Sequence, residues 1–382
     1  MEDKNKNAIR VILTGGGTGG HIYPAVAIGQ AIRQEWPGAE ILYIGTKQGL
    51  ENRIVPEAGF PLTLIDVEGW QRKVSLQAVK AGWKALKAFG AAREIIRRFS
   101  PQLVIGTGGY VCLPVVWAAS RMGIPTLLHE QNALPGLTNR LLANRVNQIL
   151  LTFAAAQQYF PAKAQEKLQV TGLPVRPAIL QVTREAGLRF FGLAPEKLTL
   201  VSVGGSRGAK TINQAMLAVC RKYAGDPGVQ IIHLTGQSGH DEFTAELQLA
   251  GINWNNNGNV IIKPYLPEME YALACADLCV ARCGAAFLAE MTVRGIPGIL
   301  IPYPYAAENH QEYNARDLVA QGAAELILDR DLSGETLLAK VEELLQQKAK
   351  RQSMAANSLR AGKPEAMENI LKIIRQYCPP CH

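Results

Sequence analysis

A glycine-rich segment near the start of the chain ends in a histidine. In TGGGTGGHIYP, residues 14–24, five of the six residues 15–20 are glycine, and His21 follows them. Backbone amides in such a bare segment can approach a ligand closely, and a helix that begins there can bind a phosphate oxygen. The imidazole can take a proton from a hydroxyl or contact the same phosphate. The segment therefore predicts a phosphate-binding loop, although glycines also serve simply to make a tight strand-to-helix turn.

The same glycines satisfy the G-x-G-x-x-G pattern of dinucleotide-binding folds. Such a fold needs an acidic residue about 20 residues further on, at the end of its second strand, to bind the ribose. The expected second strand, residues 41–44, ends instead in Gly45 and Thr46. A nicotinamide-dependent oxidoreductase is therefore an alternative that the sequence argues against.

A second group of candidate residues lies in RCGAAFLAE, residues 282–290. This segment is expected to end a strand and to begin a helix that contains Glu290. A helix N-terminus can neutralise a diphosphate, and a carboxylate can accept two hydrogen bonds from a ribose diol. The polar segment NHQEYNA, residues 309–315, follows a proline-rich loop. Helix capping by Asn309 explains only one of its polar side chains.

The elements that must position these residues alternate between strands and helices. Short apolar runs that end in glycine recur along the chain, as in AEILYIGT, PQLVIGTGGY and TLVSVGGSRG. Helix-length stretches such as residues 25–35, 76–99 and 211–223 separate them. Unbroken apolar strands between helices are typical of parallel sheets covered on both faces. The series starts twice, so we predict an α/β protein with two doubly wound Rossmann-like domains facing across a cleft. Prolines near residues 170–179 mark the boundary.

Composition limits the class of partner. The chain has 382 residues, of which 48% are hydrophobic and 19% charged, and its net charge is +8. A basic chain favours an anionic partner, and the few aromatic residues argue against nucleic acid. Seven cysteines without an apolar leader indicate free thiols. The terminal CPPCH matches a haem-attachment pattern that would require export, so we expect a frayed tail, no cofactor and no metal.

The segment SLQAVKAGWKALKAFGAAREIIRRF, residues 75–99, is basic and amphipathic. Its apolar residues recur at helical spacing and alternate with lysine and arginine. One interpretation is that the apolar stripe packs on the sheet and the cations are solvated. The other, which Trp83 and Phe89 favour, is an interfacial surface that binds anionic lipid.

Many motifs of this chain resemble, in the same order, those of the MurG family of bacterial glycosyltransferases. They include TGGGTGGHIYPAVAI, IGTGGYV, HEQNALPGLTNR, TGLPVR, GGSRGA, GAAFLAE and NHQEYNA, and the resemblance spans about residues 9–361. It implies a GT-B fold and an inverting, metal-independent transfer of N-acetylglucosamine. The implied donor is UDP-N-acetylglucosamine, and the implied acceptor is undecaprenyl-pyrophosphoryl-muramyl-pentapeptide, reached from the cytoplasmic face of the membrane.

The resemblance also implies a domain assignment. Residues 1–172 would bind the acceptor and face the membrane, and residues 173–357 would bind the UDP-sugar. A C-terminal helix, residues 358–378, would pack back on the first domain. The substrate-binding residues implied in this sequence are Thr18, Gly19, Gly20, Asn132, Arg176, Ser206, Leu266, Ala285, Ala286, Phe287, Leu288, Ala289, Glu290 and Gln311.

Three positions depart from the family's usual pattern. Cys283 stands where serine or alanine is usual, Phe287 where threonine is common, and Leu173 where asparagine is usual. Backbone contacts would survive these changes, but a hydroxyl contact at position 287 is lost.

The proposed chemistry needs a general base and a way to stabilise negative charge on the departing diphosphate. Helix N-termini, the glycine loops and Arg176 can supply the stabilisation. His21 and Glu130 are the candidates for the base. His21 can instead contact a pyrophosphate or cap its helix, and we slightly favour the pyrophosphate. A non-catalytic or epimerising relative that binds a nucleotide sugar remains a third alternative.

Overall fold

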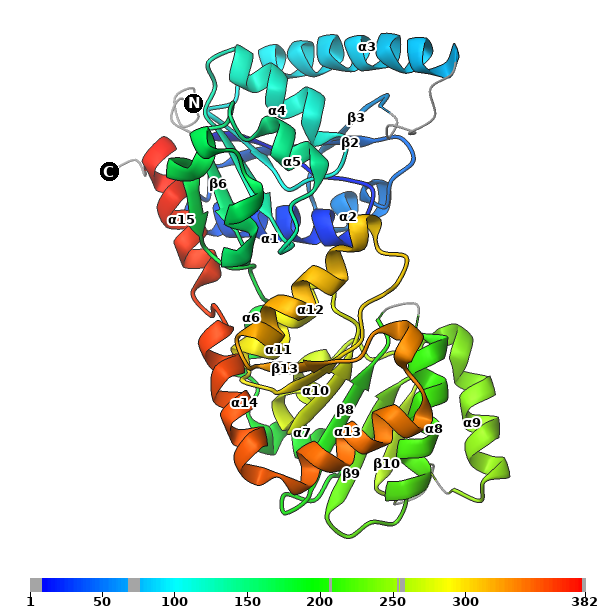
Figure 1. Cartoon of the computed structure of the whole chain (residues 1–382). Helices are drawn as coiled ribbons and strands as arrows, with labels where there is room; N and C mark the ends of the chain where they lie inside the picture. Colours follow the sequence, from blue (N-terminus) through cyan, green and yellow to red (C-terminus); the bar gives the residue numbers. More distant parts are fainter. Residues whose placement is uncertain (1–8, 68–75, 206–207, 253, 255–257, 380–382) are drawn as a thin grey trace. The chain divides into compact units, whose positions relative to one another are not determined.

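The computed structural model describes residues 9–67, 76–205, 208–252, 254 and 258–379, with the side chains of residues 76–86 outside that description. The chain forms two compact units. Unit 1 comprises Met1–Pro174 and Glu365–His382, and unit 2 comprises Val175–Pro364. Each unit is an α/β domain in which helices cover both faces of a parallel sheet (Figure 1). This confirms the predicted pair of doubly wound domains.

Unit 1 contains a seven-stranded sheet in the order β3-β2-β1-β4-β5-β6-β7, and all neighbouring strands are parallel. Its apolar strands are buried between helices, as continuous hydrophobic runs predict. The strands are β1 (Arg10–Thr14), β2 (Glu40–Thr46), β3 (Leu62–Ile65), β4 (Leu103–Gly106), β5 (Thr126–Glu130), β6 (Gln148–Leu151) and β7 (Leu168–Val170).

Two core clusters lie on opposite faces of this sheet. One joins the sheet to α1 (Gly19–Glu35), α2 (Glu51–Glu57) and α15 (Ala366–Tyr377). The other joins it to α3 (Leu76–Phe99), α4 (Cys112–Arg121) and α5 (Leu137–Leu142). Two 3₁₀ turns, Ala154–Tyr159 and Ala162–Lys167, connect β6 to β7.

The C-terminal segment differs from the single helix expected over residues 358–378. Residues up to 361 belong to α14 (Lys348–Ala361) of unit 2, where the Ser358 hydroxyl donates to the Ile296 carbonyl oxygen. Pro364 cannot continue that helix, so the chain leaves it and begins α15 at Ala366. Arg375 of α15 pairs with Glu35 of α1 at 2.9 Å. Cys378 is buried in the same core rather than frayed, and residues 380–382 lie outside the description.

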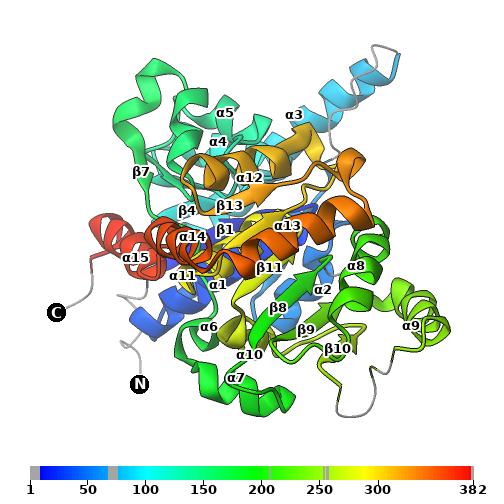
Figure 2. The ribbon, with the colours of Figure 1, turned by 60° about the horizontal axis from the view of Figure 1, so that its bottom comes forward.

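Unit 2 contains a six-stranded parallel sheet in the order β10-β9-β8-β11-β12-β13 (Figure 2). Its strands are β8 (Leu198–Val203), β9 (Val229–Leu234), β10 (Val260–Lys263), β11 (Leu278–Ala281), β12 (Gly298–Leu300) and β13 (Ala324–Leu326).

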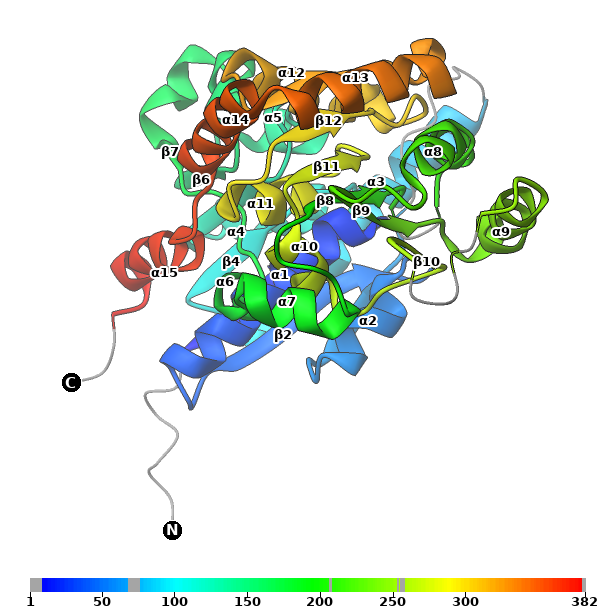
Figure 3. The same cartoon turned by 90° about the horizontal axis from the view of Figure 1, so that it is seen from below.

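The helices of unit 2 also cover both faces of its sheet (Figure 3). On one face, α8, α9 and α13 share a core with the strands. The helices are α6 (Pro177–Gln181), α7 (Arg184–Phe191), α8 (Lys210–Tyr223), α9 (His240–Leu249), α10 (Met269–Cys275), α11 (Ala285–Val293), α12 (His310–Ala320), α13 (Gly334–Gln346) and α14, with 3₁₀ turns at Gln237–Gly239, Ala307–Asn309 and Asp329–Asp331.

The basic amphipathic segment forms α3, and the described part of it packs on the sheet. Ala88, Ala92 and Ile96 are buried, and the Phe89 ring lies edge-on to Trp117 at 5.8 Å between centroids. The Phe89 side chain therefore packs partly against the interior of the protein. The stripe predicted to face lipid, including Trp83 and Lys84, lies outside the described side chains.

Two further findings concern the membrane and the cysteines. Among the described helices, none has the length and apolar character needed to span a bilayer. The six described cysteines are free and buried, as predicted from their odd number. Burial raises the pKa of Cys220 to about 12, which is typical of an unreactive core thiol.

Candidate active site

The order of strands reverses at one place in each sheet, between β1 and β4 in unit 1 and between β8 and β11 in unit 2. Ligands of open α/β sheets bind at the carboxyl ends of the strands at such a point. In unit 1, these strand ends lead into residues 15–18 and 107–110. In unit 2, they lead into Gly204 and Gly205 and into residues 282–284. The predicted glycine loops therefore lie where each sheet can bind a ligand.

The first glycine loop runs directly into the N-terminus of α1. Thr18 is the N-cap residue with an extended backbone, and its side chain makes no capping bond. Gly19 and Gly20 form the first turn, where backbone amides have no partner within the helix. Thr18 and Gly20 are exposed. The three residues therefore present free donors and the positive end of a helix to an anion.

His21 is held by its Nδ1 atom. This nitrogen lies 3.0 Å from the Thr107 carbonyl oxygen and 3.0 Å from Oε1 of Gln131, while the Thr107 hydroxyl donates to the His21 carbonyl oxygen at 2.7 Å. A Cβ atom at Gly108, whose φ is +108°, would lie 2.8 Å from Nδ1. The glycine therefore makes room for the ring. Because both acceptors engage Nδ1, Nε2 is the ring nitrogen left for a substrate.

Glu130 is 1% exposed, and its carboxylate holds together the loop that follows β5. One oxygen accepts hydrogen bonds from the backbone and side-chain nitrogens of Asn132, at 2.9 and 3.4 Å. The other accepts from the Gly136 amide at 3.0 Å and from Nδ2 of Asn139 at 2.8 Å. This geometry does not support the predicted base role, because the carboxylate already accepts four hydrogen bonds. Glu130 instead positions Asn132.

A buried carboxylate beneath the glycine loop was missed by the sequence reasoning. Oε1 of Glu51 accepts from the Thr46 amide at 2.9 Å and the Thr46 hydroxyl at 2.7 Å, and Oε2 accepts from the Gly17 amide at 3.4 Å. A Cβ at Gly49 would lie 1.8 Å from Oε2, and one at Gly16 would lie 2.8 Å from Oε1. These glycines thus leave space for the Glu51 side chain. A single glutamate in a polar turn carries no sequence signal for this role.

In unit 2, the helix after β11 offers a second anion-binding terminus. Gly284 caps α11, and Ala285, Ala286 and Phe287 form its first turn. Their amides have no partner within the helix, so they can donate to a diphosphate. Ser206 of the second glycine loop, also predicted to bind substrate, lies outside the described residues.

Three predicted substrate-binding residues offer a ligand little side-chain surface. Leu288 is 1% exposed, and its amide donates to the Gly284 carbonyl oxygen at 3.0 Å. Ala289 lies inside α11 and has only a methyl side chain. Leu266 is 6% exposed, so its backbone is the part that can meet a base.

Arg176 and Glu290, both predicted to bind the donor, contact each other. Nε of Arg176 lies 3.1 Å from Oε1 of Glu290, and Nη1 of Arg176 lies 3.2 Å from Oε2 of Glu270. Burial raises the pKa of Glu290, and the opposing effect of Arg176 is smaller. The guanidinium is half-exposed between two largely buried carboxylates. Glu270 is thus a further residue of this cluster that no motif indicated.

Gln311 is oriented by two backbone amides. Its Oε1 accepts from the amides of Cys283 at 3.1 Å and Tyr303 at 3.0 Å. Nε2 is therefore the donor atom that remains for a sugar hydroxyl. Asn314, one turn later on α12, donates to the Cys283 carbonyl oxygen at 3.1 Å. The polar residues of NHQEYNA thus clamp the strand end that precedes α11.

Arg282 is a structural residue rather than an anion ligand. Its Nη1 pairs with Asp329 at 2.5 Å and donates to the Pro302 carbonyl oxygen at 3.0 Å, and its Nη2 donates to the Thr211 hydroxyl at 3.0 Å. These contacts fix the loop between β12 and α12 to α8.

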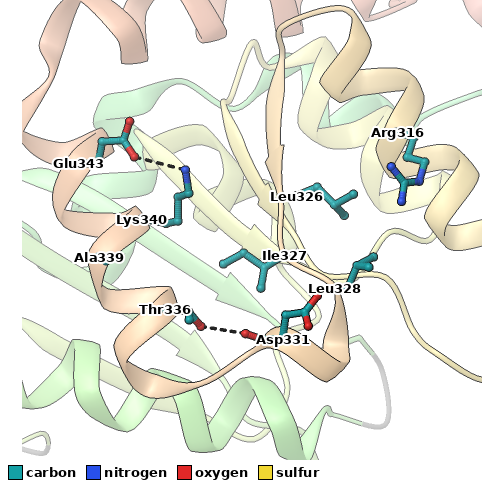
Figure 4. A pocket seen from close by; sticks show the side chains of 9 residues that line it. All are labelled: Arg316, Leu326, Ile327, Leu328, Asp331, Thr336, Ala339, Lys340 and Glu343. Carbon is teal, nitrogen blue, oxygen red and sulfur yellow. Dashed lines mark hydrogen bonds and ion pairs between the residues drawn. The ribbon is translucent and has the colours of Figure 1, made fainter.

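A shallow pocket of about 440 Å³ lies elsewhere on unit 2 (Figure 4). Its cations are already paired, Lys340 with Glu325 and Glu343, and Arg316 with Glu312. Because none of the predicted substrate-binding residues lines it, we do not assign it to the site. The lining residues are Arg316, Leu326, Ile327, Leu328, Asp331, Thr336, Ala339, Lys340 and Glu343.

Two protein-family models match this chain. Residues 11–151 match the model of the glycosyltransferase family 28 N-terminal domain, and residues 199–370 match that of the family 28 C-terminal domain. The chain is 52% identical over 371 residues to the UDP-N-acetylglucosamine–N-acetylmuramyl-(pentapeptide) pyrophosphoryl-undecaprenol N-acetylglucosamine transferase of Desulforamulus reducens. The alignment covers 97% of this chain and 99% of that protein.

Solved structures are also similar. The crystal structure of Acinetobacter baumannii MurG superposes with a TM-score of 0.78 at 27% identity, covering 96% of this chain and 99% of the other. A putative UDP-N-acetylglucosamine 2-epimerase from Listeria monocytogenes has a TM-score of 0.65 at 14% identity, covering 97% and 96%. The second likeness is one of fold alone.

Proposed function

The chain belongs to glycosyltransferase family 28, and from this premise we propose that it transfers N-acetylglucosamine from UDP-N-acetylglucosamine to undecaprenyl-pyrophosphoryl-muramyl-pentapeptide. The observation that supports this proposal is the pair of strand ends at which the strand order reverses, one in each unit. Each combines a glycine loop with a helix N-terminus, and each has polar side chains held beside it. Two anion sites suit a reaction whose two substrates are both diphosphates.

Unit 2 supplies the groups that suit the donor. Glu290 would accept hydrogen bonds from the ribose diol, and the Nε2 atom of Gln311 would donate to the sugar. The first amides of α11 would stabilise the charge that develops on UDP as it leaves. Arg176 has the charge and reach to assist once ribose competes for Glu290. The backbone around Leu266 would contact the uracil.

Unit 1 supplies the groups that suit the acceptor. The amides of Gly19 and Gly20, together with Thr18, favour the pyrophosphate of the lipid. The acceptor's 4-hydroxyl would attack the anomeric carbon on the side opposite UDP, which inverts that centre. Neutral His21 can take the hydroxyl proton at Nε2, and protonated His21 can donate to the pyrophosphate. Asn132, positioned by Glu130, is the neighbouring side chain available to the acceptor.

A lipid acceptor requires contact with a membrane. We assign this contact to the cytoplasmic face and to the basic residues of α3, with an anionic surface rather than nucleic acid as partner. The variant Trp83→Ala with Lys84→Glu should bind anionic vesicles less well, with UDP affinity unchanged. Lys348→Glu, an exposed charge reversal on α14, is the control. Equal flotation of both variants with wild type would place the lipid surface elsewhere.

A transfer assay tests the function itself. Purified protein, radiolabelled UDP-N-acetylglucosamine and a short-chain lipid acceptor are incubated with EDTA. Label should move to the lipid fraction, only when both substrates are present. Absence of labelled lipid in the presence or absence of added divalent cations would reject the proposal.

A further inference from the structure

A line of hydrogen bonds runs behind His21 into the core of unit 1. Nδ1 of His21 lies 3.0 Å from Oε1 of Gln131, and Nε2 of Gln131 lies 3.1 Å from Nδ1 of His129. Nε2 of His129 then lies 3.0 Å from the Gly172 carbonyl oxygen. Gln131 and His129 are both buried. Neither residue was singled out from the sequence.

The proton positions along this line are determined by its last acceptor. The Gly172 carbonyl can only accept, so Nε2 of His129 must carry a proton. Nδ1 of neutral His129 is then an acceptor, which requires the Gln131 amide nitrogen to face it. The same nitrogen donates to the His129 carbonyl oxygen at 2.9 Å, which excludes the flipped amide because two oxygens would meet.

Oε1 of Gln131 must therefore face His21 as an acceptor. The Thr107 carbonyl, 3.0 Å from the same ring nitrogen, imposes the same requirement. Two acceptors at Nδ1 can be satisfied only if Nδ1 carries the proton. Neutral His21 then has its lone pair on Nε2. The fold thus imposes the tautomer of His21 that is protonated at Nδ1, which is the less common tautomer of a free imidazole.

The line of bonds keeps this direction over the ordinary pH range. Burial lowers the pKa of His129 to about 4, so this ring stays neutral near pH 7. Were His129 protonated, its Nδ1 would become a donor and would oppose the Gln131 amide. Protonation of His21 itself disturbs nothing, because Nδ1 donates to the same two oxygens in both charge states.

We propose that Gln131 and His129 are positioning residues that confine proton uptake and release by His21 to Nε2. This inference rests on the proposed function for its catalytic meaning, whichever role His21 has toward the acceptor. As a base, the ring would receive the hydroxyl proton at Nε2. As a pyrophosphate ligand, it would donate the proton from that same atom. In both cases, the backing residues hold the ring in one orientation.

The direct test is the nitrogen spectrum of the histidines. The full chain is labelled with ¹⁵N-histidine, and long-range ¹H–¹⁵N correlations are recorded near pH 8.5, where histidines are neutral. Single substitutions, His21→Gln and His129→Gln, assign the signals. We expect a protonated Nδ1 in His21 and a protonated Nε2 in His129. A protonated Nε2 in neutral His21 would overturn the proposal.

Kinetics of matched variants provide a second test. Gln131→Met keeps the approximate volume and removes the hydrogen bonds of this side chain to His21 and to His129. Gln169→Met, the same exchange in β7 of the same unit, is the control. At metal-ligating histidines, loss of such a supporting partner typically costs about 10–100-fold in activity. We expect kcat of Gln131→Met to fall by about that factor, with unchanged UDP affinity.

The two tests separate the inference from the function. Wild-type kcat and an unchanged His21 spectrum in folded Gln131→Met would overturn the positioning role. If Gln131→Met does not fold, the wild-type spectrum alone decides. If the wild-type protein transfers no sugar, the proposed function is rejected. The tautomer assignment is then decided by the ¹⁵N spectrum alone.

Discussion

Nε of Arg176 lies 3.1 Å from Oε1 of Glu290, so the arginine expected at the diphosphate is paired with the carboxylate expected at the ribose. A ribose bound at its proposed position would compete with the guanidinium for this carboxylate. Binding of the ribose would free the arginine to interact with the diphosphate. The two predicted roles are therefore linked through one ion pair.

Glu290→Gln should weaken UDP binding. The loss of a charge-assisted hydrogen bond corresponds to about 1.5–3 kcal/mol. Burial raises the pKa of Glu290, so this carboxylate is protonated at a higher pH than an exposed glutamate would be. The affinity of the wild-type protein for UDP should therefore begin to fall at that higher pH on acidification. Calorimetry of UDP binding across pH measures both effects. Glu270→Gln, which removes the other partner of Arg176, is the control and should change the affinity less. Equal affinities for wild type and Glu290→Gln would remove Glu290 from the site.

His21→Ala distinguishes the two roles left open for the imidazole. As base, its loss should cut turnover by about 10²–10⁴-fold and abolish the acidic limb of the rate profile. As pyrophosphate ligand, its loss should chiefly raise the KM of the lipid acceptor and leave that limb in place. We expect the second pattern, because the glycine loop beside the ring suits phosphate. Normal turnover with normal acceptor dependence would reject both roles.

The sequence predicted the fold better than it predicted the contacts within the site. Alternating apolar runs and helix-length stretches indicated both sheets, because parallel strands must be buried on both faces. The helix predicted at residues 25–35 begins six residues earlier, at Gly19, because Pro24 fits inside its second turn. Proline there removes a single bond to Gly20, so it did not mark the start of the helix.

Contacts within the site depend on partners that lie far apart in the sequence. The sequence indicated Glu130 as a candidate base. In the structure, its carboxylate accepts hydrogen bonds from residues up to nine positions further along the chain. Gln131 and His21 are 110 residues apart, and their contact follows from β5 and β1 ending at the same edge of the sheet. A linear pattern identifies such residues as polar but does not pair them.

Gly108→Ala should disturb His21, whereas Gly123→Ala should not. Both glycines have positive φ, +108° and +73°, so both variants lose about 1–2 kcal/mol of stability from backbone strain. Only at Gly108 would the new methyl group meet the imidazole, 2.8 Å from Nδ1, whereas at Gly123 no atom lies within 4 Å. Turnover measured at a temperature where both variants remain folded should fall for Gly108→Ala alone. Equal turnover in the two variants would show that the space beside His21 is not critical.

His233→Leu should make unit 2 less sensitive to acid. His233 is fully buried beside Phe243, and burial lowers its pKa to about 3. The unfolded chain binds a proton near pH 6.5 and the folded chain does not, so stability is lost as pH falls from about 6.5 toward 3. Between pH 7.5 and 4.5 this linkage amounts to about 2–3 kcal/mol.

Urea unfolding at these two pH values measures the difference. The variant should lose less stability than wild type on acidification. His240→Leu, which changes a half-exposed histidine of the same unit, is the control. A variant with the same pH dependence as wild type would contradict the assignment of a neutral buried His233.

The structure of the reaction product tests the central claim most directly. Purified protein is incubated with UDP-N-acetylglucosamine and the short-chain lipid acceptor, and the product's anomeric carbon is examined by NMR. The donor carries an α-linkage, so displacement with inversion predicts a β-linked N-acetylglucosamine on the 4-hydroxyl of the muramyl sugar. An α-linked product would contradict the inverting mechanism. Release of a 2-epimerised sugar with no lipid-linked disaccharide would contradict the transferase assignment itself.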